Sequence, residues 1–277
     1  MKICFIGGGN MATALIAGLL KKGRRPEEIT VVEIDAGARA RLTRELGVEA
    51  HAEARRALAG ADCVVLAVKP QQMRDAAGAL GALVRGALVI TIAAGIRHAD
   101  LTRWLGGHAR IVRAMPNTPA LALAGITGLF APPAVGRDDR ARAEQILGAA
   151  GTTLWVERED EMDAVTAVSG SGPAYVFYFI EALQQAASEL GFNDAAARTL
   201  AIETFAGAVK LAAESPESVG TLRARVTSKG GTTERALAEL DRHHVREAIV
   251  SAVRAAAERS QELGIALGRE DGGGSAR

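Results

Sequence analysis

The sequence predicts an α/β domain with a doubly wound parallel sheet, followed by an all-helical domain. Up to about residue 157, short apolar runs alternate with stretches of helical spacing. From about residue 161 the strand-like runs stop and only helical spacing continues. Such βαβ alternation implies a parallel sheet with helices on both faces. We expect the α/β domain over residues 1–160, the helical domain over 161–270 and a disordered glycine-rich tail over 271–277.

The individual elements follow from apolar periodicity and from the glycines and prolines that interrupt it. The strands are expected at residues 2–7, 29–34, 48–51, 63–68 and 88–93, with a further one starting at 111–114. Helices are expected between them at residues 12–22, 38–46, 53–59, 71–83 and 99–105. The second half carries helical spacing over residues 162–190, 195–214, 218–226, 232–240 and 245–263.

Composition excludes several classes of partner. The 277 residues are 48% hydrophobic and 23% charged, which is usual for a globular enzyme. A net charge of +1 provides no field that would attract nucleic acid or an acidic membrane surface. The longest apolar runs are shorter than the ~20 residues of a spanning helix, and the N-terminus lacks the pattern of a secretory signal. We therefore expect a cytoplasmic protein with no nucleic-acid or membrane partner.

The two cysteines, Cys4 and Cys63, each lie inside an apolar run that predicts a buried strand. Both are expected to be reduced core residues, and their strands are neighbours in a doubly wound sheet. No spacing of cysteine and histidine resembles a zinc site, so no metal site is predicted.

The first strand runs into a glycine turn, Gly7-Gly8-Gly9-Asn10-Met11-Ala12, of the form G-x-G-x-x-A. Gly7 permits the tight turn, Gly9 lets a pyrophosphate approach the backbone, and Ala12 lets the helix pack on the strand. Free N–H groups at the helix N-terminus favour an anion there. These features indicate a Rossmann-like, dinucleotide-binding domain, although a purely structural glycine turn would share the pattern.

Two acidic residues, Glu33 and Asp35, stand at the end of the second strand. A carboxylate at this position accepts hydrogen bonds from the adenosine ribose and repels a 2′-phosphate. Arg39 and Arg41 lie near enough to favour a phosphate instead. The sequence leaves open which acidic residue meets the ribose, whether NADH or NADPH is preferred, and whether all four are solvated surface charges.

Further motifs lie in register with this loop. They are the segments at residues 68–71 (VKPQ), 92–95 (IAAG), 115–120 (MPNTPA), 163–175 (DAVTAVSGSGPAY) and 222–233 (LRARVTSKGGTT). Together they resemble the pyrroline-5-carboxylate reductase family over residues 1–238, and the last two are far more specific than the glycine loop. The resemblance implies NAD(P)H-dependent reduction of 1-pyrroline-5-carboxylate to L-proline by a homodimer, with a larger ring of dimers left open.

The motifs that follow the strands are assigned to the dinucleotide, because ligands bind outside the carboxyl ends of strands in open α/β sheets. Small residues at 93–95 would leave room for the nicotinamide. The residues so assigned, besides the glycine turn and the two acidic residues, are Ala67, Val68, Lys69, Pro70, Ala93, Ala94, Gly95 and Asn117.

Two motifs in the helical half are assigned to the substrate. Glycines and a proline within a helical stretch cost stability, which indicates a kink at 169–173, although a close helix crossing is an alternative. The glycine pair before residue 232 predicts a loop that opens a helix, where the threonines would cap the helix or meet a small carboxylate. The substrate residues are Ser169, Gly172, Pro173, Ser228, Gly230, Gly231, Thr232 and Thr233.

The resemblance implies that Thr233 is the catalytic residue: its side chain bonds the ring nitrogen, while backbone N–H groups of the loop hold the carboxylate. Lys229 stands where many members of the family have proline. Val219-Gly220 replaces a Pro-Gly of many members, which puts the assignment of Glu217 as a pocket carboxylate in doubt. None of the five histidines lies in a recognisable catalytic motif.

Two alternatives share the glycine loop. A 3-hydroxyacid dehydrogenase of the 6-phosphogluconate type has the same order of domains and needs a lysine in the helical domain, for which Lys210 is the main candidate. A catalytically silent dinucleotide-sensing protein would have no reason to keep Gly230 to Thr233.

Overall fold

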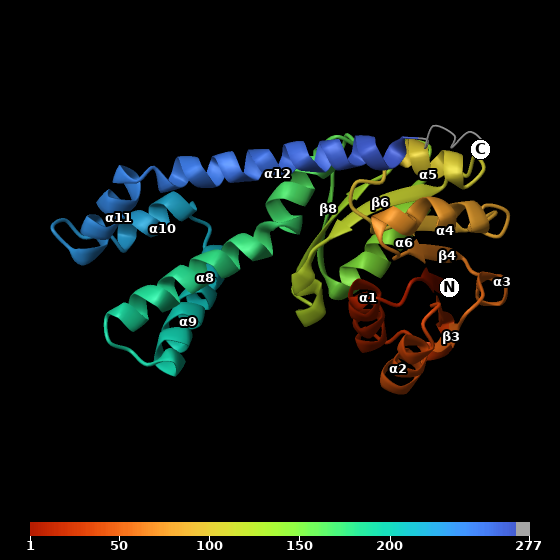
Figure 1. The fold of residues 1–277 in the computed structure, drawn as a ribbon, viewed down its shortest axis with the longest axis horizontal. Helices are drawn as coiled ribbons and strands as arrows, with labels where there is room; N and C mark the ends of the chain where they lie inside the picture. The colour runs from red at the N-terminus through yellow and green to blue at the C-terminus, as the bar shows by residue number, and fades with distance from the viewer. Residues whose placement is uncertain (270–277) are drawn as a thin grey trace, which may run out of the picture. The chain divides into compact units, whose positions relative to one another are not determined.

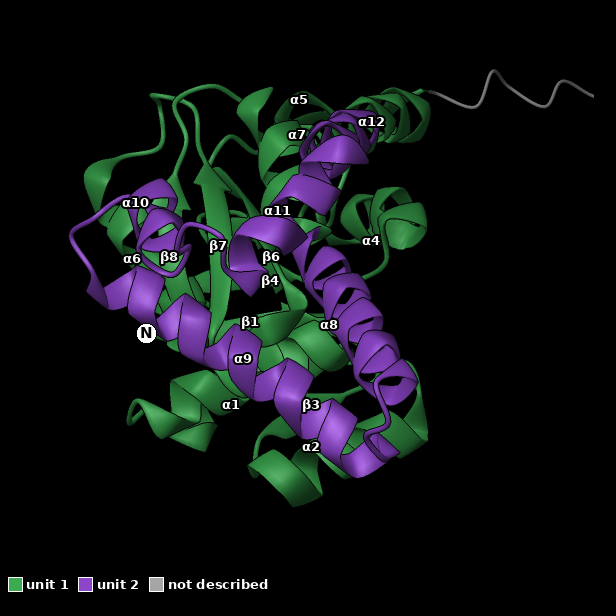
Figure 2. Cartoon of the chain, turned by 90° about the vertical axis from the view of Figure 1, so that its left-hand side faces the viewer, with its two compact units in different colours: residues 1–171, 256–277 green, residues 172–255 purple. Residues whose placement is uncertain are grey.

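The structure, a computed structural model, describes residues 1–269. The tail predicted over residues 271–277 lies outside the described residues. Packing divides the chain into two compact units, one of Met1–Ser171 with the described part of Ala256–Arg277, and one of Gly172–Ala255 (Figure 2). The domain bounds over residues 1–160 and 161–270 stay predictions, since these units follow packing rather than the change in secondary structure.

The first unit is built on one eight-stranded sheet with the order β3-β2-β1-β4-β5-β6-β7-β8 (Figure 1). The first six strands in this order are parallel, as expected for a doubly wound sheet. The strands are β1 (Ile3–Ile6), β2 (Ile29–Val32), β3 (Glu49–His51), β4 (Cys63–Leu66), β5 (Leu88–Thr91), β6 (Ile111–Pro116), β7 (Gly125–Phe130) and β8 (Gly151–Trp155).

Helices cover both faces of this sheet, as the βαβ alternation predicts. On one face pack α1 (Asn10–Lys21), α2 (Ala36–Leu46) and α6 (Arg137–Leu147). On the other pack α3 (Ala54–Ala57), α4 (Met73–Leu80) and α5 (His98–Trp104). Short 3-10 helices join them at Pro26–Glu28, Pro70–Gln72, Thr118–Ala122 and Gly148–Ala150.

The last two strands and α6 were not predicted, and they make the sheet mixed rather than wholly parallel. β7 runs antiparallel to β6, and β8 runs parallel to β7. Glycines at 125, 128 and 151 weaken the strand signal of these segments. At Gly151 the need for glycine is steric, because φ is +148° and a Cβ would overlap the carbonyl oxygen of Gly125.

The two cysteines lie on neighbouring strands but on opposite faces of the sheet. Cys4 pairs with Val64 and Cys63 pairs with Ile3, so the alternation of side chains separates the thiols. Both are free and fully buried, which confirms the expected reduced core residues. Burial raises the pKa of the Cys4 thiol to about 11 and also raises the pKa of the Cys63 thiol, so neither is a ready nucleophile.

The chain becomes helical after β8, as predicted. α7 (Glu161–Val165) continues into a π-helix (Thr166–Gly170) in the first unit. The second unit contains α8 (Gly172–Glu189), α9 (Asp194–Glu214), α10 (Val219–Arg225), α11 (Thr232–Arg242) and the first part of α12 (Val245–Gly268). No helix within residues 1–269 is long and apolar enough to span a membrane.

The C-terminal part of α12 packs on the first unit near α5 (Figure 1). Ser260, which is buried, donates its hydroxyl hydrogen to Asp163 Oδ1 over 2.6 Å. Gly95 and Gly264 meet where the helix crosses the end of β5, and a Cβ on Gly95 would lie 3.2 Å from Leu267 Cδ1. These contacts make residues of the far C-terminus part of the α/β unit.

The second unit buries little apolar surface. Its buried hydrophobic residues are Ala197 and Ala201, both on α9. In contrast, Phe177 is 60% exposed and Leu211 is 67% exposed. Tyr and Val side chains of α8 and α12 line an apolar cavity of about 400 Å³.

Gly151→Ala tests the unpredicted edge of the sheet. We expect a loss of at least about 1–3 kcal/mol, because alanine does not tolerate this backbone conformation and its Cβ would displace β7. The measurement is the urea unfolding midpoint at fixed protein concentration. Gly148→Ala is the matched control, since the φ of Gly148 is −66° and the nearest atom to a Cβ there is 3.9 Å away. Equal midpoints for the two variants would contradict this account of β8.

Candidate active site

A cavity of about 630 Å³ opens at the carboxyl ends of β1, β2 and β4. This is the place where the strand order of the sheet reverses, and where open α/β sheets bind their ligands. Its size suits a cofactor. The cavity is lined by Ile6, Gly7, Gly9, Val32, Glu33, Ile34, Asp35, Ala67, Val68, Lys69, Gln72, Asp75 and Ala76.

The glycine turn has no room for side chains on its inner side. Gly7 has a φ of +99°, and a Cβ there would lie 2.8 Å from the carbonyl oxygen of Ala67. A Cβ on Gly8 would lie 2.5 Å from Leu42 Cδ1 of α2. Gly7 is therefore required by its close approach to the backbone that follows β4, whereas a side chain at Gly8 would require Leu42 to move.

The outer side of the turn is open. A Cβ on Gly9 would meet nothing within 4 Å. Gly9 is the N-cap of α1, no side chain caps this helix, and its first turn carries no acidic residue. The uncapped N–H groups and the helix dipole suit a pyrophosphate, so the residues present fit a dinucleotide.

The Glu33 carboxylate ties the turn to the end of β2. Its Oε2 accepts a hydrogen bond from the Gly8 N–H at 2.9 Å, and its Oε1 accepts from the Asp35 N–H at 2.9 Å. Each oxygen keeps a lone pair that can accept from a hydroxyl group. Glu33 therefore shapes the turn and still presents a negative charge to the cavity.

The neighbouring residues differ in their tasks. Asp35 caps α2 by accepting from the Ala38 N–H at 2.6 Å. Arg39 donates to the carbonyl oxygens of Glu33 and Ile34, both at 2.8 Å, and so braces the backbone. The Ile34 side chain is 82% exposed and lines the cavity, a role that sequence reasoning missed together with those of Gln72, Asp75 and Ala76.

Two groups of predicted cofactor residues do not line this cavity. Ala93 is buried in the core, and Gly95 packs against the C-terminal part of α12. Asn117 is 8% exposed, with its Oδ1 accepting from the Ile126 N–H at 2.9 Å and its Nδ2 donating to the Ser169 carbonyl at 3.1 Å. The sequence predicted neither the packing of Gly95 against α12 nor the two hydrogen bonds of the Asn117 side chain.

In the second unit, the loop before α11 opens a helix as predicted. Gly230 has a φ of +72°, and a Cβ on Gly231 would lie 2.5 Å from Ser228 Oγ. Gly231 is the N-cap of the 11-residue helix α11, which no side chain caps. Glu234 reaches back so that its Oε2 accepts from the Gly230 N–H at 2.7 Å. Neither threonine accepts as a cap, and Thr233 is half-buried while Thr232 is exposed.

The other titratable candidates are engaged elsewhere or exposed. Glu217 forms an ion pair with Arg225 at 2.5 Å, and Lys210 is exposed on α9. Burial lowers the pKa of both His98 and His108, which are half-buried, so neither carries a charge near neutral pH. Within residues 1–269, no group of three or more His, Cys, Asp or Glu side chains could hold a metal ion.

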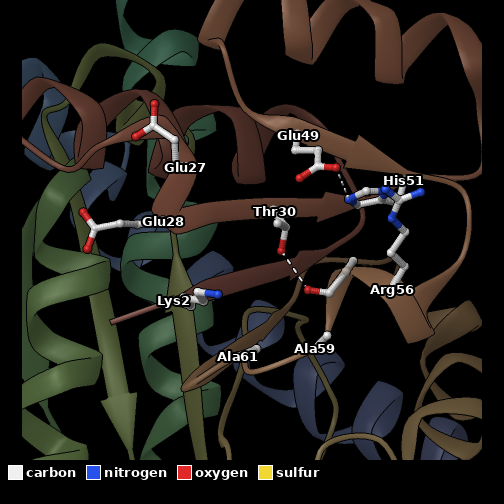
Figure 3. A pocket seen from close by; sticks show the side chains of 10 residues that line it. Lys2, Glu27, Glu28, Thr30, Glu49, His51, Arg56, Ala59 and Ala61 are labelled. Atoms are coloured by element: carbon white, nitrogen blue, oxygen red, sulfur yellow. Dashed lines mark hydrogen bonds and ion pairs between the residues drawn. The ribbon is translucent and has the colours of Figure 1, made fainter.

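A second cavity, of about 250 Å³, lies at the amino ends of β1 and β2 (Figure 3). Its lining mixes charges of both signs, such as Lys2 and Arg56 with Glu27 and Glu49. Figure 3 shows His51 beside Glu49, whose Oε1 lies 3.1 Å from the His51 Nε2. Because parallel sheets bind ligands at the opposite ends of their strands, this cavity is not the candidate site.

Comparison with known proteins identifies the family. Residues 159–263 match the family model described as pyrroline-5-carboxylate reductase dimerisation, and residues 2–95 match one described as NADP oxidoreductase, coenzyme F420-dependent. The pyrroline-5-carboxylate reductase of Haemophilus influenzae is 44% identical over 263 residues, covering 94% of this chain and 97% of that protein. The chain belongs to the pyrroline-5-carboxylate reductase family.

Solved structures of pyrroline-5-carboxylate reductases agree with this assignment. That from Coxiella burnetii matches with a TM-score of 0.90 and 42% identity, covering 95% of this chain and 98% of that one. The Plasmodium falciparum pyrroline carboxylate reductase, solved with NADP bound, matches with a TM-score of 0.86 and 27% identity, covering the same shares of the two chains. The predicted fold, an α/β unit followed by a helical region of the reductase family, is confirmed.

For this family member, the structure brings together part of the predicted site. Gly7, Gly9, Glu33, Asp35, Ala67, Val68 and Lys69 line the cavity of about 630 Å³. Gly8, the first residues of α1 (Asn10, Met11 and Ala12) and Pro70 of the 3-10 helix after Lys69 lie beside it without lining it. Ser169 is in the first unit, while Gly172, Pro173 and the loop before α11 belong to the second. The binding roles of all these residues stay predictions.

Two variants test whether Glu33 or Asp35 contacts the ribose of the cofactor. Asp35→Asn keeps the α2 cap, because asparagine caps as well as aspartate, and removes one negative charge. Glu33→Ala removes a charge and both bonds that hold the turn. We expect both to shift the ratio of kcat/KM towards NADPH, and only Glu33→Ala to lower stability, by about 1–3 kcal/mol.

The measurement is kcat/KM for NADH and NADPH beside thermal unfolding. An unchanged cofactor ratio in both variants would mean that neither carboxylate meets the ribose.

Proposed function

We propose that this family member is an NAD(P)H-dependent oxidoreductase that acts on a CH–NH group and reduces 1-pyrroline-5-carboxylate to L-proline. The observation that carries the proposal is the loop before α11, which combines the most specific family motif with an uncapped helix N-terminus. A catalytically silent protein would have no reason to keep such a loop. A 3-hydroxyacid dehydrogenase would need a lysine such as Lys210, which is exposed.

The substrate carboxylate is assigned to the N-terminus of α11. The Gly230 N–H already donates to Glu234, so the anchor falls to N–H groups of the first helical turn, at Thr232 and Thr233. The helix dipole favours a carboxylate there. Because Gly231 has no side chain, Ser228 can pack closely against the N-terminus of α11.

Thr233 is assigned to the ring nitrogen. A protonated cyclic imine carries an N–H that can donate to the threonine oxygen, and it is already a good electrophile. When bound, the reduced nicotinamide supplies the hydride that the imine carbon accepts. The C=N bond becomes C–N, the nitrogen keeps its proton, and the product is a secondary amine. The chain therefore has to orient the ring rather than supply a strong acid.

The dinucleotide is assigned to the cavity around the glycine turn. Gly7, Gly8 and Gly9 with the N-terminus of α1 would hold the pyrophosphate, and Glu33 or Asp35 would accept from the ribose hydroxyls. The exposed Ile34 side chain offers an apolar surface for the adenine ring. Because two carboxylates stand at this position, we propose that the enzyme uses NADH and also accepts NADPH.

A cytoplasmic location, a small-molecule substrate and a homodimer complete the proposal. Two buried free thiols fit a reducing compartment. For the dimer, the support is the unit Gly172–Ala255, whose buried hydrophobic residues are two alanines. A unit with so small a hydrophobic core needs to bury further apolar surface, here against a second chain, to be stable. Large exposed apolar patches mark such interfaces.

Thr233→Ala should lower kcat/KM for the imine roughly 5- to 150-fold, since one site hydrogen bond is worth about 1–3 kcal/mol. Affinity for the dinucleotide should change little, because Thr233 and the glycine turn belong to different units. Thr232→Ala is the control in the same helical turn, and thermal unfolding is recorded for both. A folded Thr233→Ala enzyme with wild-type kcat/KM would remove the threonine from the chemistry.

Light scattering at micromolar concentration should give the mass of two chains or of a multiple of two. Ile249→Glu, at the edge of the apolar cavity on α12, should lower both the mass and the unfolding temperature, because it places a charge in the proposed interface. A wild-type mass of 28.8 kDa would refute the dimer.

A further inference from the structure

The Ser169 carbonyl occupies a special position in the helix that begins at α7. In a regular α-helix it would accept from the N–H of residue 173. Residue 173 is proline, which has no N–H. The helix is widened to a π-helix at Thr166–Gly170, with the Ser171 N–H donating to the Thr166 carbonyl at 2.9 Å. Such π segments cluster at functional sites.

The Asn117 side chain provides the donor that Pro173 cannot. Its Nδ2 lies 3.1 Å from the Ser169 carbonyl oxygen, across 52 residues of chain. Its Oδ1 accepts from the Ile126 N–H at 2.9 Å, so the amide is fixed between the end of β6 and the start of β7. Asn117 is only 8% exposed and Ser169 is half-buried, so the contact is partly shielded from solvent.

A second contact holds the same turn against β6. A Cβ on Gly170 would lie 2.6 Å from Met115 Cε, so the π-helix rests directly on β6, the strand that Asn117 follows. The hydroxyl of Ser169 donates to the Val165 carbonyl at 3.0 Å, which leaves only its lone pairs for a ligand. The backbone of the π-helix at Ser169 and Gly170 is thus held against β6 and Asn117, while the Ser169 side chain is held within its own helix.

We propose that Asn117 is a positioning residue for the substrate: it compensates for the donor lost at Pro173 and so fixes the widened turn that carries Ser169. The role differs from the dinucleotide contact expected from the sequence. It rests on the proposed function and on the predicted contact of Ser169 with the substrate, both of which the kinetic readout uses.

The test is a double-mutant cycle between Asn117→Asp and Pro173→Ala. Aspartate keeps the acceptor for Ile126 but loses the donor for Ser169, so KM for the imine should rise at least about fivefold. KM for NADPH should stay unchanged, whereas a merely structural defect would lower the active fraction and move neither KM. Alanine at 173 restores an N–H, so in that background Asn117→Asp should raise KM for the imine less than about twofold.

Asn193→Asp is the matched control. Asn193 caps α9 through its Oδ1 and aspartate caps equally well, so this change should alter neither KM nor stability.

Equal effects of Asn117→Asp in the two backgrounds, or none in either, would overturn the proposal. If Asn117→Asp alone does not fold, folding of the double variant Asn117→Asp, Pro173→Ala is measured instead, and failure of Pro173→Ala to restore folding would overturn the proposal. A wild-type enzyme inactive on the imine would refute the proposed function, while the same cycle measured by unfolding temperature would still decide the link.

Discussion

The close contact between the glycine turn and β4 is the constraint on which the α/β unit depends. A Cβ on Gly7 would overlap the Ala67 carbonyl, so no side chain fits at this point of the turn, and a Cβ on Gly8 would press against Leu42 of α2. With the turn held this way, α1 begins at the carboxyl ends of the strands and presents its uncapped N-terminus to the cavity. The Glu33 carboxylate secures the arrangement through the Gly8 N–H. Packing and anion binding are therefore satisfied by the same short segment.

The helical unit depends on a different constraint, which is its lack of a core. Two alanines of α9 are its buried hydrophobic residues, although α8 and α12 present an apolar cavity. α12 belongs to both units, since Ser260 and Leu267 pack on the α/β unit while Val245 and Ile249 line the apolar cavity. Assembly of two chains would therefore stabilise a unit whose helices also carry the proposed substrate loop.

The sequence predicted correctly the elements whose positions depend on residues close by in the chain. Strand β1, the turn at Gly7 and the opening of α11 at Gly231 follow from apolar runs and from glycine, so their positions were predicted. β7 and β8 were missed because glycines interrupt them, and their pairing depends on contacts distant in the chain. The different roles of Glu33 and Asp35 could not be predicted from strand alternation, because β2 ends at Val32 and both residues lie after it. Their roles are set by hydrogen bonds: Glu33 accepts from the Gly8 N–H, and Asp35 accepts from the Ala38 N–H. The link from Asn117 to Ser169 spans 52 residues and has no periodic signal.

The central claim is that the chain delivers a hydride to the carbon of a cyclic imine. The most direct measurement uses NADPH or NADH in which both hydrogens at C4 of the nicotinamide are deuterium, supplied with 1-pyrroline-5-carboxylate, with the product analysed by mass spectrometry and NMR. The account predicts consumption of the reduced cofactor and L-proline carrying one deuterium on the ring carbon next to nitrogen that bears no carboxylate. Unlabelled proline, or oxidation of the cofactor only with substrates that contain no imine, would contradict it.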